Sequence, residues 1–173
     1  PRDGVTAEKL AKLPPVYKLE HREGTVTAAN ASGITDGASA VIVVSPRKAE
    51  ELGLTPMARY TGGVVVGCEP ARMGLGPVYA LEALQQKYGK SVSDFDLVEL
   101  NEAFAAQVLA CQRGLNIPPE KLNVNGGAIA LGHPIGCTGN RMTVTLLHEL
   151  KRRGGGKGLA TLCVSGGFGI AGM

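Results

Sequence analysis

The stretch of sequence that decides the fold is FDLVELNEAFAAQVLACQRG, residues 95–114. Residues 95–100 are mostly apolar over a length typical of a buried strand, so they predict one. Residues 102–114 have the spacing of an amphipathic helix instead. Apolar side chains recur there at offsets of four, three and four, at Phe104, Val108, Cys111 and Leu115. A strand that runs directly into a helix is a building unit of α/β folds.

The same alternation of strands and helices extends outward in both directions along the chain. Apolar and alternating runs predict further strands at residues 25–28, 38–44, 58–67, 122–125 and 158–164, with 168–173 as a hairpin partner of the last. Helical spacing and capping residues predict further helices at residues 6–13, 46–52, 77–88 and 138–153. The predicted class is therefore α/β.

Composition and charge exclude several classes of protein. With 44% apolar and 19% charged residues, the chain is ordinary for a globular protein with a core. The net charge of +3 is mild, and no basic stripe with aromatic side chains points to nucleic acid. No apolar run approaches the roughly 18 residues that a membrane span requires. We expect a protein without nucleic-acid or membrane partners, in the cytoplasm or in an organelle matrix.

The four cysteines, Cys68, Cys111, Cys137 and Cys163, are widely spaced along the chain. No two of them form a CxxC pair, so we expect neither a metal site nor a redox dithiol. Wide spacing in a chain of this size favours a reducing compartment over a disulfide framework. The sequence begins at Pro1 without an initiator methionine, so we also expect a fragment or a processed product.

Polar or reactive residues stand in three segments where a predicted strand ends. The segments are LNEAFA at residues 100–105, NGGAIALGHPIG at 125–136 and LCVSGG at 162–167. In open α/β sheets, ligands gather at the carboxyl ends of strands. Each segment is therefore a candidate part of one site.

Each candidate residue also has a purely structural interpretation. Taken alone, Asn101 reads as a helix N-cap, with Glu102 complementing the helix dipole in the first turn. His133 is either a hydrogen-bonded loop histidine or a general base that the flanking glycines and Pro134 hold rigidly. Cys163 is either a small buried apolar residue or a thiol beside exposed backbone N–H groups that would stabilise a thiolate.

Taken together, these motifs resemble the signature of the thiolase family in their order and spacing. The resemblance lies in NEAFA at residues 101–105, GGAIALGHP at 126–134 and Cys163 before a glycine cluster. The loop NASG at residues 30–33, just ahead of a predicted strand, also looks like the family's. Similarity extends over essentially the whole chain, so the chain is identified as a member of that family.

The resemblance implies a fold and a division of the chain. Thiolases have two related halves that pack as a five-layer αβαβα sandwich, and this chain would provide the C-terminal half. Residues 1–33 would end the loop domain that shelters coenzyme A, and residues 34–54 would return a strand and a helix to the N-terminal half. Residues 55–173 would form the C-terminal domain. The predicted strand at 38–44 would then lack its sheet in this chain alone.

The same resemblance implies reversible acyl transfer between a 3-ketoacyl thioester and coenzyme A, a co-substrate, with no covalently bound cofactor. A nucleophilic cysteine of the N-terminal half would attack the ketone carbon, and His133 would take that cysteine's proton. Cys163 would protonate the carbanion left by carbon–carbon cleavage and then deprotonate the incoming thiol, which requires a pKa near ambient pH. His133 and a water fixed by Asn101 would hold the enolate oxygen.

Further roles follow from the resemblance. Ser165 would donate a backbone N–H to an oxyanion, with Gly166 in support. Ser32, Ala103 and Arg2 would contact coenzyme A, although by themselves Ser32 reads as a turn residue and Arg2 as a solvated charge. Acyl-CoA, the N-terminal half and a second copy in a homodimer or tetramer are the partners implied.

Two departures from the family pattern leave a second hypothesis open. No cysteine of this chain stands in the nucleophile's motif, a cysteine followed by small residues and glycine. Ser165 replaces a glycine, so its side chain could crowd the acyl group. The alternative is a non-catalytic acyl-CoA or lipid-binding module with the thiolase fold. A decarboxylating ketoacyl synthase is disfavoured, because the position of Cys163 is typically histidine or asparagine in that class.

Overall fold

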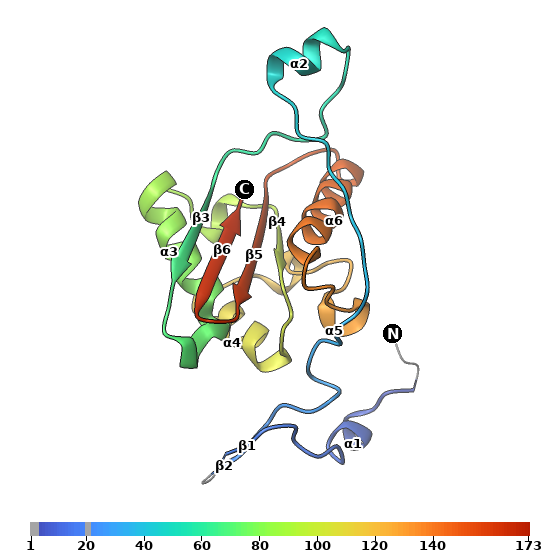
Figure 1. Cartoon of the computed structure of the whole chain (residues 1–173), viewed down its shortest axis with the longest axis vertical. Coiled ribbons are helices and arrows are strands. Elements are labelled where there is room, and N and C mark those ends of the chain that lie inside the picture. Colours follow the sequence, from blue (N-terminus) through green and yellow to red (C-terminus); the bar gives the residue numbers. More distant parts are fainter. Residues whose placement is uncertain (1–3, 20–21) are drawn as a thin grey trace.

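The structure is a computed structural model that describes residues 4–19 and 22–173 of the chain (Figure 1). Its strands are β1 (Lys18–Leu19), β2 (Arg22–Glu23), β3 (Gly63–Gly67), β4 (Leu97–Leu100), β5 (Gly158–Val164) and β6 (Phe168–Gly172). Its α-helices are α1 (Ala7–Leu10), α2 (Pro46–Glu51), α3 (Gly76–Tyr88), α4 (Ala105–Leu115), α5 (Ala128–Leu131) and α6 (Thr138–Arg152). Short 3₁₀ helices are η1 (Pro70–Leu75), η2 (Val92–Asp94) and η3 (Pro119–Lys121).

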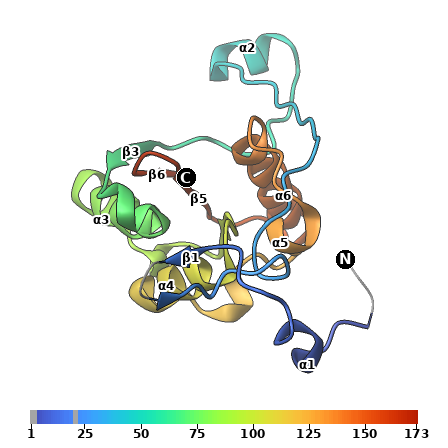
Figure 2. The same ribbon diagram turned by 60° about the horizontal axis from the view of Figure 1, so that its bottom comes forward.

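A four-stranded sheet in the order β3-β6-β5-β4 forms the centre of the molecule. Strands β4 and β5 are parallel, whereas β6 is antiparallel to both of its neighbours. Helices α3 and α4 lie on one face of the sheet and α6 lies on the other (Figure 1, Figure 2). This arrangement confirms the predicted α/β class.

Strand β4 is buried along its whole length because it lies between the two helical layers. Val98 and Leu100 belong to the cluster that packs with α3 and α4. Leu97 faces the other way and packs with Leu146 and Leu150 of α6. A strand covered on both faces needs apolar side chains at successive positions, which explains Leu97, Val98 and Leu100. Burying each such leucine contributes about 1.5–3 kcal/mol relative to exposure. The exception in this strand is Glu99, which is buried with Oε2 3.8 Å from Arg141 Nη1 of α6.

Most of the predicted elements are present, with shifts at their ends. The predicted strand at 158–164 is β5, and β6 follows it as the predicted hairpin partner. Helices α2, α3 and α6 agree with their predicted ranges to within a residue at each end. Helix α1 is shorter than predicted, and β3, β4 and α4 begin later than predicted. These shifts change no layer of the fold.

The predicted strand at residues 25–28 is wrong, because an asparagine side chain satisfies the backbone there. The amide of Asn30 donates to the carbonyl oxygen of Thr25 at 2.9 Å and accepts from the backbone N of Thr27 at 2.7 Å. Local bonds of this kind fold the chain into a turn instead of leaving groups for a partner strand.

The predicted strand at residues 122–125 is wrong for a similar reason. Asn123 has a φ of +46°, outside the extended region, and only Leu122 forms a bridge, to Val98. The side-chain amide of Asn123 accepts from the backbone N of Leu100 at 2.8 Å and donates to its carbonyl oxygen at 2.9 Å. One side chain therefore gives the end of β4 the two hydrogen bonds that a neighbouring strand would provide.

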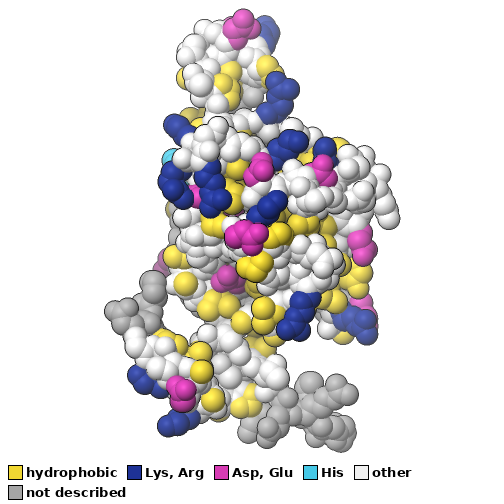
Figure 3. Space-filling view, turned by 180° about the vertical axis from the view of Figure 1, so that it is seen from behind, with side chains coloured by type: hydrophobic (Ala, Val, Ile, Leu, Met, Phe, Trp, Pro, Cys, Tyr) yellow, Lys and Arg dark blue, Asp and Glu magenta, His cyan; other side chains and the backbone are white. Residues whose placement is uncertain are grey.

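The predicted strand at residues 38–44 pairs with no strand in the described part of the chain. It runs along α6 (Figure 1), where Asn140 Nδ2 donates to Ser39 Oγ at 2.8 Å. Ile42 and Val43 are 90% and 87% exposed. Helix α2 then projects from the body, and apolar side chains lie open on this projection (Figure 3). Contiguous exposed apolar side chains are typical of a surface that another part of a protein covers.

Glu149 joins the last turn of α6 to the start of the glycine-rich loop. Its carboxylate is buried and accepts from Arg152 Nη2 at 2.6 Å, from Arg153 Nε at 2.6 Å and from Asn125 Nδ2 at 3.1 Å. These hydrogen bonds, those from Arg152 first, lower the pKa of Glu149 from 4.5 to about 2. A carboxyl group with a lowered folded-state pKa stabilises the fold above its unfolded pKa and loses that effect as the pH falls.

We expect the stabilising effect of Glu149 to disappear as the pH falls from about 4.5 to about 2. At neutral pH, Glu149→Gln should be less stable than the wild-type chain, because the neutral amide forms weaker bonds to both arginines. Towards pH 2 the difference in free energy of unfolding should vanish. Urea unfolding at a series of pH values measures it, and a difference that stays constant with pH would contradict the assignment.

Candidate active site

The side-chain amide of Asn101 is buried at the carboxyl end of β4. The residue is 1% exposed, and its backbone N donates to the carbonyl oxygen of Thr161 in β5 at 3.0 Å. Neither Oδ1 nor Nδ2 has a hydrogen-bond partner among the described residues. Helix α4 has Phe104 as its N-cap, so the N-cap interpretation of Asn101 is wrong. A buried amide without partners is costly, which marks this position as a place for a water or a ligand.

Glu102 holds the glycine-rich loop at residues 125–136 and lies outside the first turn of α4. One carboxylate oxygen accepts from the backbone N of Ile129 at 3.1 Å, and the other accepts from Asn123 Nδ2 at 3.0 Å. Gly127 lies so close to this carboxylate that a Cβ atom would overlap it. The glycine therefore permits the contact that fixes the loop.

Glu102→Ala is expected to lower the free energy of unfolding by about 1–3 kcal/mol, because the partly buried Ile129 N–H loses its acceptor and Asn123 Nδ2 loses one of its two acceptors. Exchange of the Ile129 amide proton should also become faster. Glu120→Ala, at an exposed position of η3, is the matched control. Chemical denaturation of both variants measures the effect, and equal stabilities would show that Glu102 does not hold the loop.

His133 stands just after α5, in a loop fixed by its neighbours. Gly132 has a φ of +99°, a conformation that favours glycine, and the backbone N of His133 donates to Gly33 O at 2.8 Å. The imidazole Nδ1 lies 2.7 Å from Thr138 Oγ1. Burial, and next the charge of Arg141, lower the pKa of His133 below 6.5. The imidazole is therefore neutral at neutral pH, the form that a general base requires.

The loop that carries Ser32 lies against the turn after β4. The backbone N and Oγ of Ser32 both bond to the carbonyl oxygen of Ala103, at 3.0 and 3.3 Å. The next residue, Gly33, is the one that binds the backbone of His133. Figure 2 shows this N-terminal segment passing α4 and reaching α5. Ser32, Ala103 and His133 therefore lie in adjoining segments, whereas Arg2 lies outside the described residues.

Cys163 is 7% exposed near the end of β5. Burial raises the pKa of its thiol above 9.0, although a backbone hydrogen bond acts in the opposite direction. This direction differs from the pKa near ambient pH that the resemblance implied, because desolvation of a thiolate outweighs the nearby dipoles. Ser165 and Gly166 are exposed in the turn to β6, where Gly166 has a φ of +88°. The thiol is therefore protonated at neutral pH.

Three of the predicted residues gather at one end of the sheet. Because β4 and β5 are parallel, Asn101 and Cys163 lie near the carboxyl ends of their strands, at the same end of the sheet. The loop of His133 leads into the first turn of α6, which packs on this end. A Cβ atom on Gly139 in that turn would lie 3.9 Å from Leu162 Cδ2. The arrangement gives this end a neutral imidazole, an unpartnered amide and a protonated thiol.

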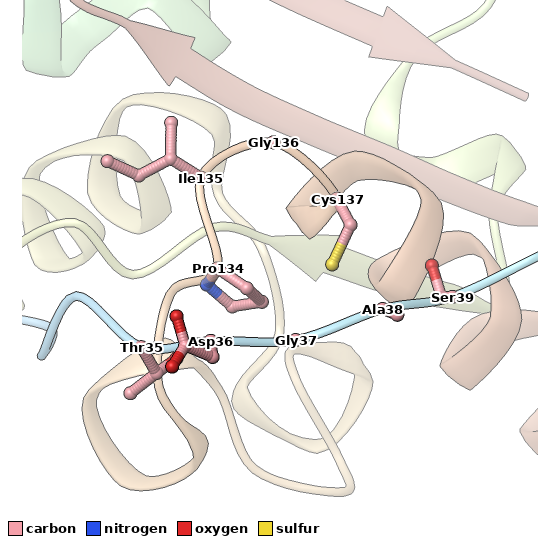
Figure 4. A pocket seen from close by; sticks show the side chains of 9 residues that line it. All are labelled: Thr35, Asp36, Gly37, Ala38, Ser39, Pro134, Ile135, Gly136 and Cys137. Carbon is pink, nitrogen blue, oxygen red and sulfur yellow. The ribbon is translucent and has the colours of Figure 1, made fainter.

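A cavity of about 410 Å³ lies beside the loop of His133, between residues 35–39 and residues 134–137 (Figure 4). Pro134 and the sulfur of Cys137 face the extended segment across it. None of the predicted site residues lines this cavity, so it is not the predicted site. The cavity adjoins the extended segment in which Ile42 and Val43 are exposed.

Two side chains that hold the site were not predicted from the sequence. Thr138 bonds to His133, and Asn123 bonds to Glu102. The sequence did contain a signal for Thr138. A hydroxyl side chain at the first position of a helix can form hydrogen bonds with groups of the loop one turn before it. In residues 4–19 and 22–173, no group of histidine, cysteine and acidic side chains could hold a metal ion, and no helix is long and apolar enough to cross a membrane.

Comparison with known families identifies the class of the chain. Residues 54–173 match the thiolase C-terminal domain, and residues 1–47 match the thiolase N-terminal domain. The chain therefore belongs to the thiolase family, and the identification made from its motifs is confirmed.

Its relatives include the acetyl-CoA acetyltransferase of Chromobacterium violaceum, 57% identical over 166 residues that cover 96% of this chain and 42% of that protein. The crystal structure of human mitochondrial 3-ketoacyl-CoA thiolase in complex with CoA is similar with a TM-score of 0.92 at 53% identity, covering 99% of this chain and 43% of that one. The dimeric peroxisomal thiolase of Saccharomyces cerevisiae is similar with a TM-score of 0.89 at 42% identity, with the same coverages of 99% and 43%. The chain thus has the thiolase fold and spans about 42% of the length of the relatives it matches.

Proposed function

We propose that this chain supplies the general base and the second cysteine of a thiolase active site. The reaction is the reversible thiolytic cleavage of a 3-ketoacyl-CoA, acetoacetyl-CoA included, by coenzyme A. The observation that supports it most is the buried amide of Asn101, which has no partner among the described residues and lies at the edge where β5 brings Cys163. Such an amide suits a fixed water that contacts a substrate oxygen.

The chemistry begins with a nucleophilic cysteine from an N-terminal thiolase half. His133 takes the proton of that cysteine as its sulfur attacks the ketone carbon. The carbon–carbon bond then breaks, and its electron pair passes to the departing acetyl-CoA enolate. The imidazolium and the water on Asn101 hold the enolate oxygen, contacts worth about 3 kcal/mol by analogy with oxyanion holes.

Cys163 gives its proton to the enolate carbon and becomes a thiolate. Its raised pKa suits this step, because the thiol is protonated before the carbanion forms. The thiolate then takes the proton of the incoming coenzyme A, whose sulfur attacks the acyl-enzyme and releases the shortened acyl-CoA. The proton therefore returns to Cys163. The nucleophilic cysteine leaves the acyl group as a thiolate and takes back its proton from the imidazolium of His133, so the site ends each cycle as it began.

Coenzyme A is the proposed co-substrate, with no covalently bound cofactor. Ser32 and Ala103 adjoin the loop of His133 and are proposed to contact its pantetheine part, and Arg2 its nucleotide part. The backbone N–H of Ser165, supported by Gly166, is proposed as a second oxyanion donor. A related thiolase has been crystallised with CoA, which supports this part of the proposal.

An N-terminal half is the proposed partner of the extended segment at residues 38–44. Exposed Ile42 and Val43, with backbone groups that bond to no described strand, suit addition of this segment to another sheet. We propose that residues 1–33 end the loop domain, 34–54 belong to the N-terminal half and 55–173 form the C-terminal domain. A homodimer or tetramer is proposed as the assembly, since one relative is a dimer.

The test is a chimera, in which this chain is joined to the part of the Chromobacterium violaceum relative that precedes its matched region. The chimera should cleave acetoacetyl-CoA in the presence of coenzyme A, whereas the isolated chain should not. Loss of acetoacetyl-CoA absorbance measures the rate. A folded chimera without thiolysis would contradict the proposal.

A second candidate is a non-catalytic acyl-CoA or lipid-binding module. Ser165 in the turn after Cys163, where the family usually has glycine, favours it. Calorimetry separates the two functions. Tight binding of coenzyme A by the isolated chain, together with an inactive chimera, would support the binding module instead.

A further inference from the structure

The side chain of Thr138 connects the imidazole of His133 to a backbone carbonyl. Thr138 is 1% exposed at the first position of α6. Its Oγ1 lies 2.7 Å from Nδ1 of His133 and 2.9 Å from the carbonyl oxygen of Pro134. The three groups form a short chain of hydrogen bonds at the start of the helix.

This chain of hydrogen bonds has one direction, because a hydroxyl group has one proton. The carbonyl of Pro134 can only accept, so the hydroxyl of Thr138 donates to it. Nδ1 of His133 must then carry a proton and donate it to Oγ1. The opposite arrangement would place two acceptor oxygens 2.9 Å apart with no proton between them.

We infer that Thr138 is a positioning residue that fixes His133 as the Nδ1–H tautomer and leaves the lone pair on Nε2. The partner of one ring nitrogen sets the state of the other, and in water the neutral imidazole of histidine prefers its proton on Nε2. The protein therefore selects the less common tautomer. Under the proposed function, on which this step rests, Nε2 is the atom that takes the proton of the nucleophile.

A hydroxyl partner also has an electrostatic consequence. A carboxylate on Nδ1 would favour the imidazolium and raise the pKa of the ring. Thr138 orients the ring without adding charge, and the charged group that acts on His133, Arg141, favours the neutral form. Arg141 has no acceptor to offer Nδ1–H, so the tautomer depends on the threonine hydroxyl.

The first test is ¹⁵N NMR of the imidazole nitrogens in the full 173-residue chain, at a pH above the pKa of His133. The chain has three histidines, His21, His133 and His148, so single substitutions assign the signals. Wild type and Thr138→Ser should have protonated Nδ1 and unprotonated Nε2. Thr138→Val, which keeps the shape and removes the hydroxyl, should shift His133 towards Nε2–H.

A wild-type His133 protonated on Nε2 would overturn the inference, and so would a folded Thr138→Val chain whose tautomer is unchanged. The wild-type spectrum decides the first point even if the valine variant does not fold. This readout does not depend on catalysis, so it stands apart from the proposed function.

The second test measures kinetics in the chimera. Thr138→Val should lower kcat about 100-fold with little change in KM, because the wrong ring nitrogen carries the proton, and Thr138→Ser should stay within a few fold of wild type. Equal kcat values for the valine and serine variants would overturn the inference. An inactive wild-type chimera would count against the proposed function, while the tautomer measurement would still decide the role of Thr138.

Discussion

His133→Ala in the chimera is expected to slow acylation of the enzyme by acetoacetyl-CoA by about 10³–10⁴-fold. The variant loses the base that activates the nucleophile and, at the next step, a donor to the enolate oxygen. Both roles act on the transition state, so kcat should fall more than KM rises. Rapid-mixing measurement of the acyl-enzyme burst reports this step directly.

His148→Ala is the matched control for this prediction. His148 is an exposed histidine of α6, and the described contacts give it no hydrogen bond or ion pair. Its substitution should leave the burst rate within a few fold of wild type. Wild-type burst kinetics in the folded His133→Ala chimera would remove His133 from the mechanism.

Cys163→Ser in the chimera is expected to reduce carbon–carbon cleavage by about 10²–10⁴-fold. A serine hydroxyl has nearly the same shape as the thiol but is a far weaker acid, so it cannot protonate the enolate carbon at a useful rate. The same group removes an α-proton from acetyl-CoA in the reverse direction. Deuterium uptake from heavy water into the methyl group of acetyl-CoA should therefore fall together with thiolysis.

Cys68→Ser tests whether the effect belongs to Cys163. Cys68 is a partly buried thiol whose backbone N donates to Gly167 O at 2.7 Å, in the turn that follows Cys163. Its substitution should leave deuterium uptake and thiolysis close to wild type. If both serine variants lost activity to the same degree, the loss would reflect damage to this turn and not loss of a proton donor.

The core of the fold was predictable because its signals are local. The mostly apolar run at 95–100 and the helical spacing after it mark β4 and α4, which have the expected order and burial. The hairpin of β5 and β6 followed from an alternating run and a glycine turn. Each of these patterns depends on residues that are neighbours in sequence.

The predicted strand at 25–28 was replaced by a turn through bonds of the nearby Asn30, whereas the one at 122–125 was wrong for a reason that is not local. Asn123 replaces a strand by bonding to both backbone groups of Leu100, which is 23 residues away. Nothing in residues 122–125 indicates that partner. The segment at 38–44 has a strand sequence but no strand beside it in the described chain, so its composition alone could not predict its exposure.

The candidate site shows the same contrast between local signals, which the sequence contains, and contacts that only the fold creates. The motifs indicated Asn101, His133 and Cys163 as candidate site residues, and the fold brings these three to one end of the sheet. The hydrogen bonds that hold the loop of the site join residues far apart in the sequence, such as the one from the backbone N of Ile129 to the carboxylate of Glu102. The pKa of Cys163 depends on burial, which a glycine-rich sequence does not reveal.

The measurement that tests the account most directly is a crystal structure of the chimera with coenzyme A bound. We predict that the sulfur of coenzyme A lies in one pocket with Nε2 of His133, Sγ of Cys163 and the nucleophilic cysteine, with a water on the amide of Asn101. A coenzyme A sulfur bound away from both side chains, or an imidazole and a thiol on opposite faces of the sheet, would contradict the account.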